Sequence, residues 1–443
     1  MLKRKANDTM ARWIASPHRK PLLLRGARQV GKSTLVRNFA SSQAFMLNEV
    51  NLERHRELKE VFATMNPKAI CERIGAILGR DVRAPGAILF LDEIQAVPEA
   101  IAALRYFYEE MAELPVVAAG SLLEFALADH SFSMPVGRIE YLHLGPMDFI
   151  EFAQAVNPYL ASLLSIEAIC AEDGFAAHQE AMKLLRTFLA VGGMPESVLR
   201  YTESGSMAEV SLVHEQILST YVDDFAKYAS GRDLAHMQSI FSRLGVNVAR
   251  KVKYVNFSRE MRSREVKDIL DMFLKARLIS KVAHTDANGV PLGAEEDANV
   301  WKPLFLDVGL MNHANGIGVR ELESLDDIAL VGEGAIAEQF VGQHLLYREG
   351  PSIRPHLNYW LREGASNNAE VDFVLADSFT VLPIEVKAGK AGSLRALRQM
   401  LAEKKLKRAI RFDAGKFSRQ DVRLTPDTSY ELITYPLYAA PLL

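Results

Sequence analysis

The chain has 443 residues, which is too many for one ordinary hydrophobic core, so two or three domains are expected. Hydrophobic residues make up 49%, charged residues 24%, and the net charge of −3 excludes a globally basic nucleic-acid-binding protein. Two cysteines, Cys71 and Cys170, are too few for a disulfide framework or a zinc site and fit a reducing compartment. Without a signal-peptide pattern or a run of about eighteen apolar residues, a cytoplasmic protein that spans no membrane is expected.

The first 150 residues alternate between short apolar runs and segments of helical composition. Helices are expected at 33–40 and 100–112, between strands that form a parallel sheet covered on both faces. The predicted fold class is therefore α/β. The expected strands are 21–24, 45–52, 87–91, 115–119 and 139–144.

The remainder of the chain divides into three segments with different patterns. Residues 151–230 are mostly helical, with a break at Gly192-Gly193-Met194-Pro195. Residues 231–315 contain several helices and then a hairpin around Asn288-Gly289, which fits either a winged helix or a helical connector with a surface hairpin. Residues 330–443 are expected to form a separate α/β domain, reached through a linker between Val308 and Gly332.

A glycine-rich motif follows the first expected strand and matches the pattern G-x-x-x-x-G-K-[ST]. Two glycines allow the backbone N–H groups to point at phosphate oxygens, and the following helix adds its positive end. Lys32 is expected to reach the β and γ phosphates, and the Ser33 hydroxyl to bind Mg²⁺. The sequence therefore predicts a site for ATP and Mg²⁺ formed by Gly26, Ala27, Arg28, Gln29, Val30, Gly31, Lys32, Ser33 and Thr34.

An acidic pair follows the third expected strand, at Asp92 and Glu93. Asp92 stands at the carboxyl end of a buried strand and is expected to accept from Ser33 and from Mg²⁺-bound water. Glu93 is expected to polarise the water that attacks the γ-phosphate. A strand end with a solvated carboxylate pair is the alternative if the phosphate motif is set aside.

These motifs resemble those of the AAA ATPases of bacteria and archaea that carry a C-terminal domain of unknown function. The likeness extends to residues 90–95, 119–121, 136–138 and 192–196. The resemblance implies an ATPase core at 1–150, a helical lid at 151–230 and a linker domain at 231–315. It also implies a homo-oligomer with ATP at the subunit interfaces.

The resemblance implies roles for further side chains. Ser121 takes the place of sensor 1, between Asp92 and the γ-phosphate, and Arg138 that of an arginine finger that enters a neighbouring subunit's site. An unpaired surface serine and a surface arginine are the plainer alternatives. Either Arg186 or Arg200 is implied as the sensor 2 arginine of the lid, and the choice between them stays open.

A second constellation lies in residues 330–443, at Glu338, Asp372, Glu385 and Lys387. Glu385 and Lys387 share one strand face because strand side chains repeat every two residues, and a hairpin brings Asp372 beside Glu385. The arrangement resembles the PD-(D/E)xK nuclease fold. That resemblance implies Mg²⁺ bound by Asp372 and Glu385, with Glu338 as a further ligand and Lys387 acting on water or phosphate. The alternative is a strand with a charged, solvated outer face.

A basic stretch supports DNA as the partner. Residues 387–423 contain twelve Lys and Arg against three acids, enough to attract a phosphate backbone. The expected function is an ATP-hydrolysing ATPase coupled to a nuclease-like domain that acts on DNA. The alternatives are a nucleotide-gated scaffold with an inactive nuclease fold and a protein-remodelling ATPase. The protein-remodelling alternative lacks support from a pore loop, because no aromatic pore-loop signal is found between Glu53 and Ala84.

Overall fold

The computed structural model describes residues 2–121, 123, 135–225, 232–317, 334–364, 368–389 and 393–443, so most of the predicted linker at 308–332 lies outside it. The described chain forms two compact units. The first comprises Met1–Gly145, Lys275–Arg277 and Glu349–Arg354, and the second comprises Pro146–Leu274, Leu278–Arg348 and Pro355–Leu443.

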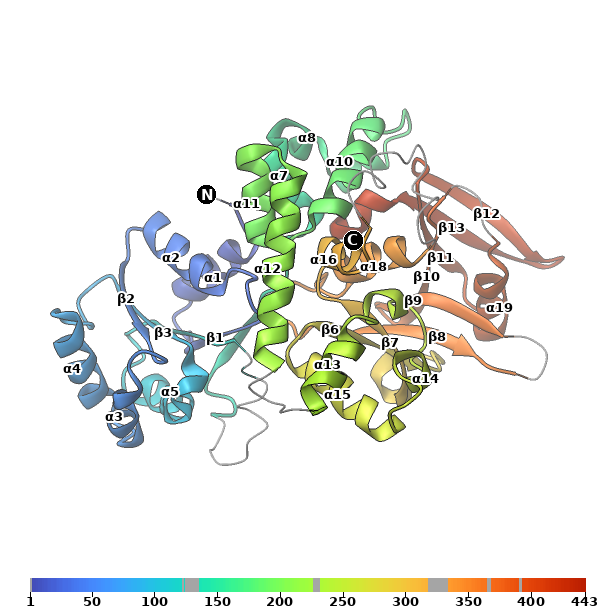
Figure 1. Ribbon diagram of the computed structural model, residues 1–443. Coiled ribbons are helices and arrows are strands. Elements are labelled where there is room, and N and C mark those ends of the chain that lie inside the picture. The colour runs from blue at the N-terminus through green and yellow to red at the C-terminus, as the bar shows by residue number, and fades with distance from the viewer. Residues whose placement is uncertain are drawn as a thin grey trace. The chain divides into compact units, whose positions relative to one another are not determined.

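The first unit is built on a five-stranded parallel sheet, as the sequence predicts (Figure 1). The strand order β2-β3-β4-β1-β5 places β4 between the strand that precedes the phosphate motif and the strand that ends in Asp92. Parallel strands end at one edge of a sheet, so three strand ends gather there. The strands are β1 (Leu22–Arg25), β2 (Met46–Asn51), β3 (Ala87–Asp92), β4 (Val116–Ala119) and β5 (Glu140–His143).

Helices accompany this sheet and supply much of its core. Pro67 and Pro98 stand at the first positions of two of them, where a missing N–H does no harm. Strand β3 is buried along its whole length, which fits a parallel strand covered on both faces. The helices are α1 (Ala6–Ala15), α2 (Lys32–Ser42), α3 (Lys59–Ala63), α4 (Pro67–Leu78) and α5 (Pro98–Glu110).

The second unit begins with a helical series that includes the Gly192-Gly193 motif. Asp307 caps α16 by accepting from the backbone N–H groups of Gly309 and Leu310, and it also accepts from Gly193 N at 2.7 Å. The motif is therefore held against α16 by a fully buried carboxylate. The helices are α7 (Phe149–Val156), α8 (Pro158–Leu163), α9 (Ile166–Ile169), α10 (His178–Val191), α11 (Pro195–Ser204), α12 (Met207–Phe225), α13 (Arg232–Phe241), α14 (Tyr254–Phe257), α15 (Ser263–Lys275) and α16 (Val308–Ala314).

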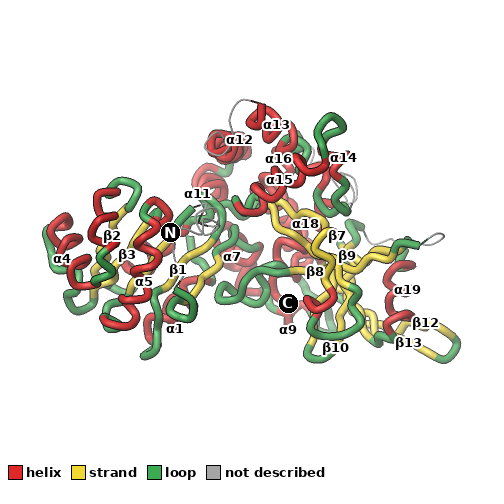
Figure 2. Tube along the Cα trace, turned by 90° about the horizontal axis from the view of Figure 1, so that it is seen from below, coloured by secondary structure: helices red, strands yellow, loops and turns green. Residues whose placement is uncertain are grey.

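The second unit also contains an eight-stranded mixed sheet in the order β12-β13-β11-β10-β9-β8-β6-β7 (Figure 2). The hairpin β6–β7, which lies in the predicted linker segment, joins this sheet because β6 pairs in parallel with β8. The strands are β6 (Ile279–Thr285), β7 (Glu296–Phe305), β8 (Leu357–Arg362), β9 (Ala369–Asp377), β10 (Thr380–Val386), β11 (Arg408–Asp413), β12 (Ser418–Thr425) and β13 (Thr428–Pro436).

Two helices pack on this sheet, α18 (Ala335–Leu345) and α19 (Arg395–Lys404). Helix α18 approaches the strands closely at Gly342, where an added Cβ would lie 2.7 Å from both Leu304 Cδ1 and Phe373 Cζ. Only a glycine allows this approach, which brings Glu338 of the same helix to the strands β7 and β9. None of the described helices has the length and apolar character needed to cross a membrane.

Candidate functional site

The phosphate motif forms the turn between β1 and α2. In this turn Ala27 and Val30 are buried, Arg28 is partly buried and Gln29 is exposed. Ser33 and Thr34 lie in the first turn of α2. An added Cβ at Gly26 would lie 2.3 Å from the Leu144 carbonyl oxygen, so this first position of the motif requires glycine.

Lys32 stands at the start of α2 and is buried. Its Nζ donates to the carbonyl oxygens of Gly26 at 3.1 Å and Ala27 at 2.7 Å, so the ammonium group lies over the motif. Burial lowers the pKa of Lys32 to about 8, against the opposing effect of Glu93 and Asp92. An anionic ligand at this turn would stabilise the charged form of the lysine.

The acidic pair lies beside the phosphate motif, as predicted. Ser33 Oγ donates to both carboxylate oxygens of Asp92, each at 3.0 Å. Burial raises the pKa of Asp92, so that a cation next to it would be stabilising. A hydroxyl oxygen and a carboxylate at hydrogen-bond distance are oxygen donors of the kind that Mg²⁺ prefers, so these residues fit the predicted ion.

Glu93 is held in a constrained geometry. Its backbone has φ 51° and ψ 48°, a left-handed conformation that is uncommon for a residue with a side chain. Its Oε2 accepts from Gln95 Nε2 and from Ser121 Oγ at 2.9 Å. Burial alone would raise the pKa of Glu93, but these hydrogen bonds outweigh it and hold the pKa below its usual range, which keeps the carboxylate ionised.

The structure therefore gives Ser121 a partner that differs from the predicted one. Its hydroxyl contacts Glu93, the residue expected to polarise water, whereas Asp92 is bonded to Ser33. Gln95, which the sequence analysis did not assign a role, lies in the 3-10 turn Ile94–Ala96 that follows Glu93 and donates to the same carboxylate oxygen. The signal that could have found Gln95 was its place in the motif at residues 90–95.

Arg138 precedes β5 on the first unit, where the sequence places it. Its Nε donates to Glu109 Oε1 at 2.8 Å, and 44% of its side chain is exposed. The same carboxylate accepts from Arg105, so Glu109 holds two arginines at the surface. An exposed arginine in a surface ion pair can exchange its partner for an anion of another molecule. The role of Arg138 across a subunit interface stays a prediction.

The two sensor 2 candidates lie in the second unit. Arg186 is on α10, and Arg200 is on α11, where it forms ion pairs with Glu203 at 3.8 Å and Glu209 at 3.9 Å. The choice between them stays a prediction.

The second predicted site brings together Asp372 on β9, Glu385 on the adjacent strand β10 and Lys387 directly after β10. The register pairs Ile384 with Phe373, which places Glu385 next to Asp372. Asp372 Oδ2 accepts from Val386 N at 2.7 Å, and Lys387 Nζ forms an ion pair with Glu385 Oε1. Only 8% of Asp372 and 4% of Glu385 are exposed, so this is not the solvated strand face that was the alternative.

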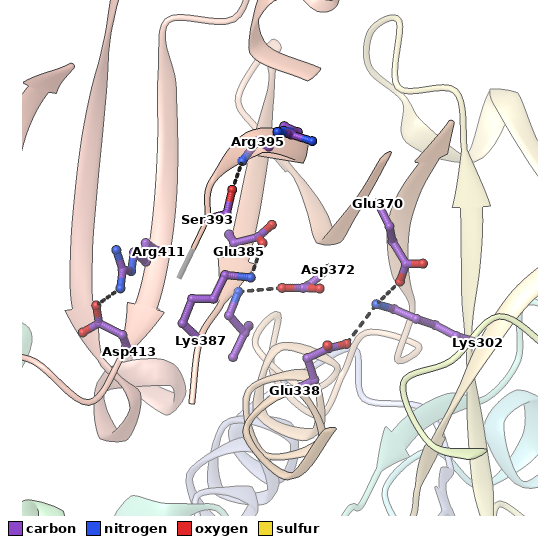
Figure 3. Close-up of polar contacts among 11 residues, drawn as sticks. Lys302, Glu338, Glu370, Asp372, Glu385, Lys387, Ser393, Arg395, Arg411 and Asp413 are labelled. Atoms are coloured by element: carbon purple, nitrogen blue, oxygen red, sulfur yellow. Dashed lines mark hydrogen bonds and ion pairs between the residues drawn. The ribbon is translucent and has the colours of Figure 1, made fainter. Parts of the chain in front are cut away.

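Glu338 takes a different place from the predicted one. Its Oε2 accepts from Lys302 Nζ at 3.1 Å, and the same ammonium donates to Glu370 Oε1 at 3.2 Å (Figure 3). Lys302 is fully buried on β7 and lies 5.1 Å from the ring centres of Tyr359 and Phe373. Burial and the nearby Asp372 raise the pKa of Glu338, while the surrounding carboxylates outweigh burial and raise that of Lys302.

The predicted set of three carboxylate ligands is therefore not assembled. Within the described ranges, no three His, Cys, Asp or Glu side chains are placed to hold one metal ion, because Glu338 is directed at Lys302. Two carboxylates still fit a cation. Glu385 Oε2 is buried without a hydrogen-bond partner among the described residues, and burial beside Asp372 raises the pKa of Glu385. An orphaned carboxylate oxygen next to a second carboxylate is a site that a divalent ion would satisfy.

Lys302 was missed by the sequence analysis. It interrupts an apolar run at residues 300–306, and one charged residue in such a run is a signal of a buried, paired group. The hairpin that carries it was assigned to a different segment, so no pattern connected Lys302 with Glu338.

The basic stretch is largely exposed. Six of its cations are exposed, on α19, in the loops after α19 and after β11, and on β12, and they form no ion pair within the part of the chain that the structure describes. Three others are paired: Arg408 and Arg419 with Glu431, and Arg411 with Asp413. Lys390 lies outside the described residues. The six are Arg395, Arg398, Lys405, Lys407, Lys416 and Arg423.

Comparison with protein families gives matches to three regions of the chain. Residues 18–153 match the family described as an AAA domain. Two families described as domains of unknown function, DUF8612 and DUF4143, match residues 182–321 and 333–434. No curated protein matches the chain. The chain thus carries an AAA-type P-loop ATPase domain followed by two regions whose families have no stated function.

Three solved structures resemble the chain at low identity. The Walker-type ATPase of Pyrococcus abyssi is 16% identical, with a TM-score of 0.43, over 71% of this chain and 96% of that one. The ORC1 protein of Aeropyrum pernix, solved in complex with DNA, is 14% identical with a TM-score of 0.27, over 71% and 93%. A signal-transduction ATPase with numerous domains from Pyrococcus horikoshii is 13% identical with a TM-score of 0.27, over 78% and 45%.

Proposed function

We propose that this chain, which carries an AAA-type ATPase domain, binds and hydrolyses ATP with Mg²⁺ and uses the cycle to act on DNA through its nuclease-like second unit. The observation that supports hydrolysis is the convergence of Lys32, Ser33-Asp92 and Glu93 at one edge of the parallel sheet.

Each group at that edge has a distinct task in phosphoryl transfer. Lys32 offsets the charge of the β and γ phosphates, and Ser33 with Asp92 would hold Mg²⁺ beside them. Glu93, kept ionised by Gln95 and Ser121, accepts a hydrogen bond from the attacking water. A bound Mg²⁺ neutralises charge that develops on the phosphate oxygens.

The proposal of DNA as partner depends on the six unpaired cations of the basic stretch. Cations without an internal partner lose no ion pair when they meet a phosphate backbone, and they release condensed counterions from DNA on binding. The alternatives are a scaffold that binds DNA without cutting it and an ATPase whose partner is a protein.

The full chain should bind a short DNA duplex with an affinity that falls steeply as salt rises from about 50 to 200 mM. Exchanging Arg398, Lys405 and Lys407 for glutamine should weaken DNA binding. It should also reduce the slope of log affinity against log salt concentration by about one per removed phosphate contact. Fluorescence anisotropy measures this, with Lys68→Gln, an exposed lysine on α4, as the matched control. The full chain is used because β8 pairs with β6, which lies outside residues 333–443.

The same DNA also tests cutting. If the domain is a nuclease, Mg²⁺ or Mn²⁺ supports nicking, Lys387→Ala stops it with binding retained, and Asp372→Asn removes both the metal dependence and the cutting. Binding without nicking supports the scaffold. Absence of DNA binding even at low salt contradicts the proposal and leaves an ATPase with a protein partner.

A further inference from the structure

A lysine from outside the predicted nuclease-like segment enters its carboxylate site. Lys302 lies on β7 of the hairpin β6–β7, whereas Glu338, Asp372 and Glu385 come from α18, β9 and β10. The hairpin reaches them because β6 and β7 extend the same sheet. The ammonium is buried and donates to two carboxylates, one on α18 and one on β9.

The charges of the site can be counted from the structure. Four carboxylates, those of Glu338, Glu370, Asp372 and Glu385, face two ammonium groups, those of Lys302 and Lys387. Two ammonium groups cannot balance four carboxylates, and one divalent cation would supply the two positive charges that they lack. Uncompensated charge at this depth is costly, so the site favours a further cation.

The geometry also indicates where that cation belongs. Glu338 and Glu370 already share the Lys302 ammonium at 3.1 and 3.2 Å. In contrast, Glu385 keeps one buried oxygen, Oε2, without a hydrogen-bond partner among the described residues, next to Asp372. The oxygens that still lack a cation therefore lie at the Asp372–Glu385 end of the site.

We propose that Lys302 acts as a fixed cation in this site and takes the place of one metal ion. The site then binds a single divalent ion at Asp372 and Glu385, and Glu338 serves as the partner of Lys302 rather than as a metal ligand. The inference deepens the proposed function, on which it rests for the nature of the site, by stating how many ions the site takes and which residues hold them.

Mn²⁺ alone is the probe, and the free Mn²⁺ signal in electron paramagnetic resonance gives the number bound per chain. The full chain is used without nucleotide and with Asp92→Asn, so that the ATP site adds no ion. One Mn²⁺ per chain is expected, and Glu385→Gln should abolish its binding. Glu338→Gln should leave the number of bound Mn²⁺ ions unchanged and the Mn²⁺ affinity unchanged within about threefold, since Glu338 is not a ligand of the ion. No bound ion, two bound ions, or a loss in Glu338→Gln equal to that in Glu385→Gln would overturn the proposal.

Lys302→Met provides the opposite change. Without the ammonium, Glu338 and Glu370 become available, and the number of bound Mn²⁺ should rise from one to two. Lys281→Met on β6 is the matched control, because Lys281 bonds to the Ala298 carbonyl and not to this site, and it should stay at one. A folded Lys302→Met protein that still binds one ion contradicts the proposal. If that variant does not fold, the comparison of Glu338→Gln with Glu385→Gln decides alone.

The outcome is separable from the proposed function. DNA affinity is measured without metal, and the Mn²⁺ count is measured without DNA. Loss of DNA binding with one Mn²⁺ bound at Glu385 would contradict DNA as the partner and leave the fixed cation in place.

Discussion

Replacing Lys32 with alanine is expected to abolish ATP binding. The Lys32 ammonium is buried over the phosphate motif and donates to the carbonyl oxygens of Gly26 and Ala27. Charge-assisted hydrogen bonds contribute about 1.5–3 kcal/mol each. Loss of contacts to two phosphates should therefore lower the affinity for ATP by a factor on the order of 100 or more. Titration with a fluorescent ATP analogue measures the affinity.

The matched control for this change is Lys68→Ala. Lys68 is exposed on α4 of the same unit, so its loss removes one positive charge without touching the turn. An unchanged affinity in Lys68→Ala and a lost affinity in Lys32→Ala are expected. Normal ATP affinity in Lys32→Ala would remove the site assignment.

Glu93→Gln should have the opposite profile: ATP stays bound and hydrolysis slows. Glutamine keeps the size of the side chain and the contact to Ser121 but cannot take up a proton from water. Loss of general-base assistance slows such reactions about 10²- to 10⁴-fold. Single-turnover hydrolysis of bound ATP measures the rate, while the titration used for Lys32→Ala measures binding.

Glu110→Gln is the control for Glu93→Gln. Glu110 is exposed at the end of α5, where removal of its charge leaves the strand edge untouched. Its hydrolysis rate should equal that of the unchanged protein. A Glu93→Gln protein that hydrolyses ATP at full rate would assign the water-activating role to another group.

The first unit could be predicted closely from the sequence because each of its signals is local. The run at 87–91 and the acidic pair after it are contiguous, and β3 and Asp92 lie where this run places them. Gly26 in the motif predicts a tight turn. Only the structure shows that the nearby Leu144 carbonyl leaves no room for a side chain at this position.

The second unit was harder to predict from the sequence because its sheet and its buried charged site join segments that are distant along the chain. Residues 330–443 contain both helices and strands, as predicted, yet the hairpin β6–β7 completes their sheet from more than fifty residues upstream of β8. Periodicity identifies a strand but not its neighbour, so the pairing of β6 with β8 could not be read from the pattern. Lys302 was missed for the same reason, since its partner Glu338 lies on another element.

The link between ATP and DNA is the central claim, and the rate of ATP hydrolysis by the full chain with and without duplex DNA tests it most directly. At low salt, DNA should raise the rate several-fold, and the increase should fade as salt screens the basic stretch. The glutamine variant of Arg398, Lys405 and Lys407 should keep the basal rate and lose most of the stimulation. A hydrolysis rate that DNA leaves unchanged at every salt concentration, in a protein that still binds ATP, would contradict the account.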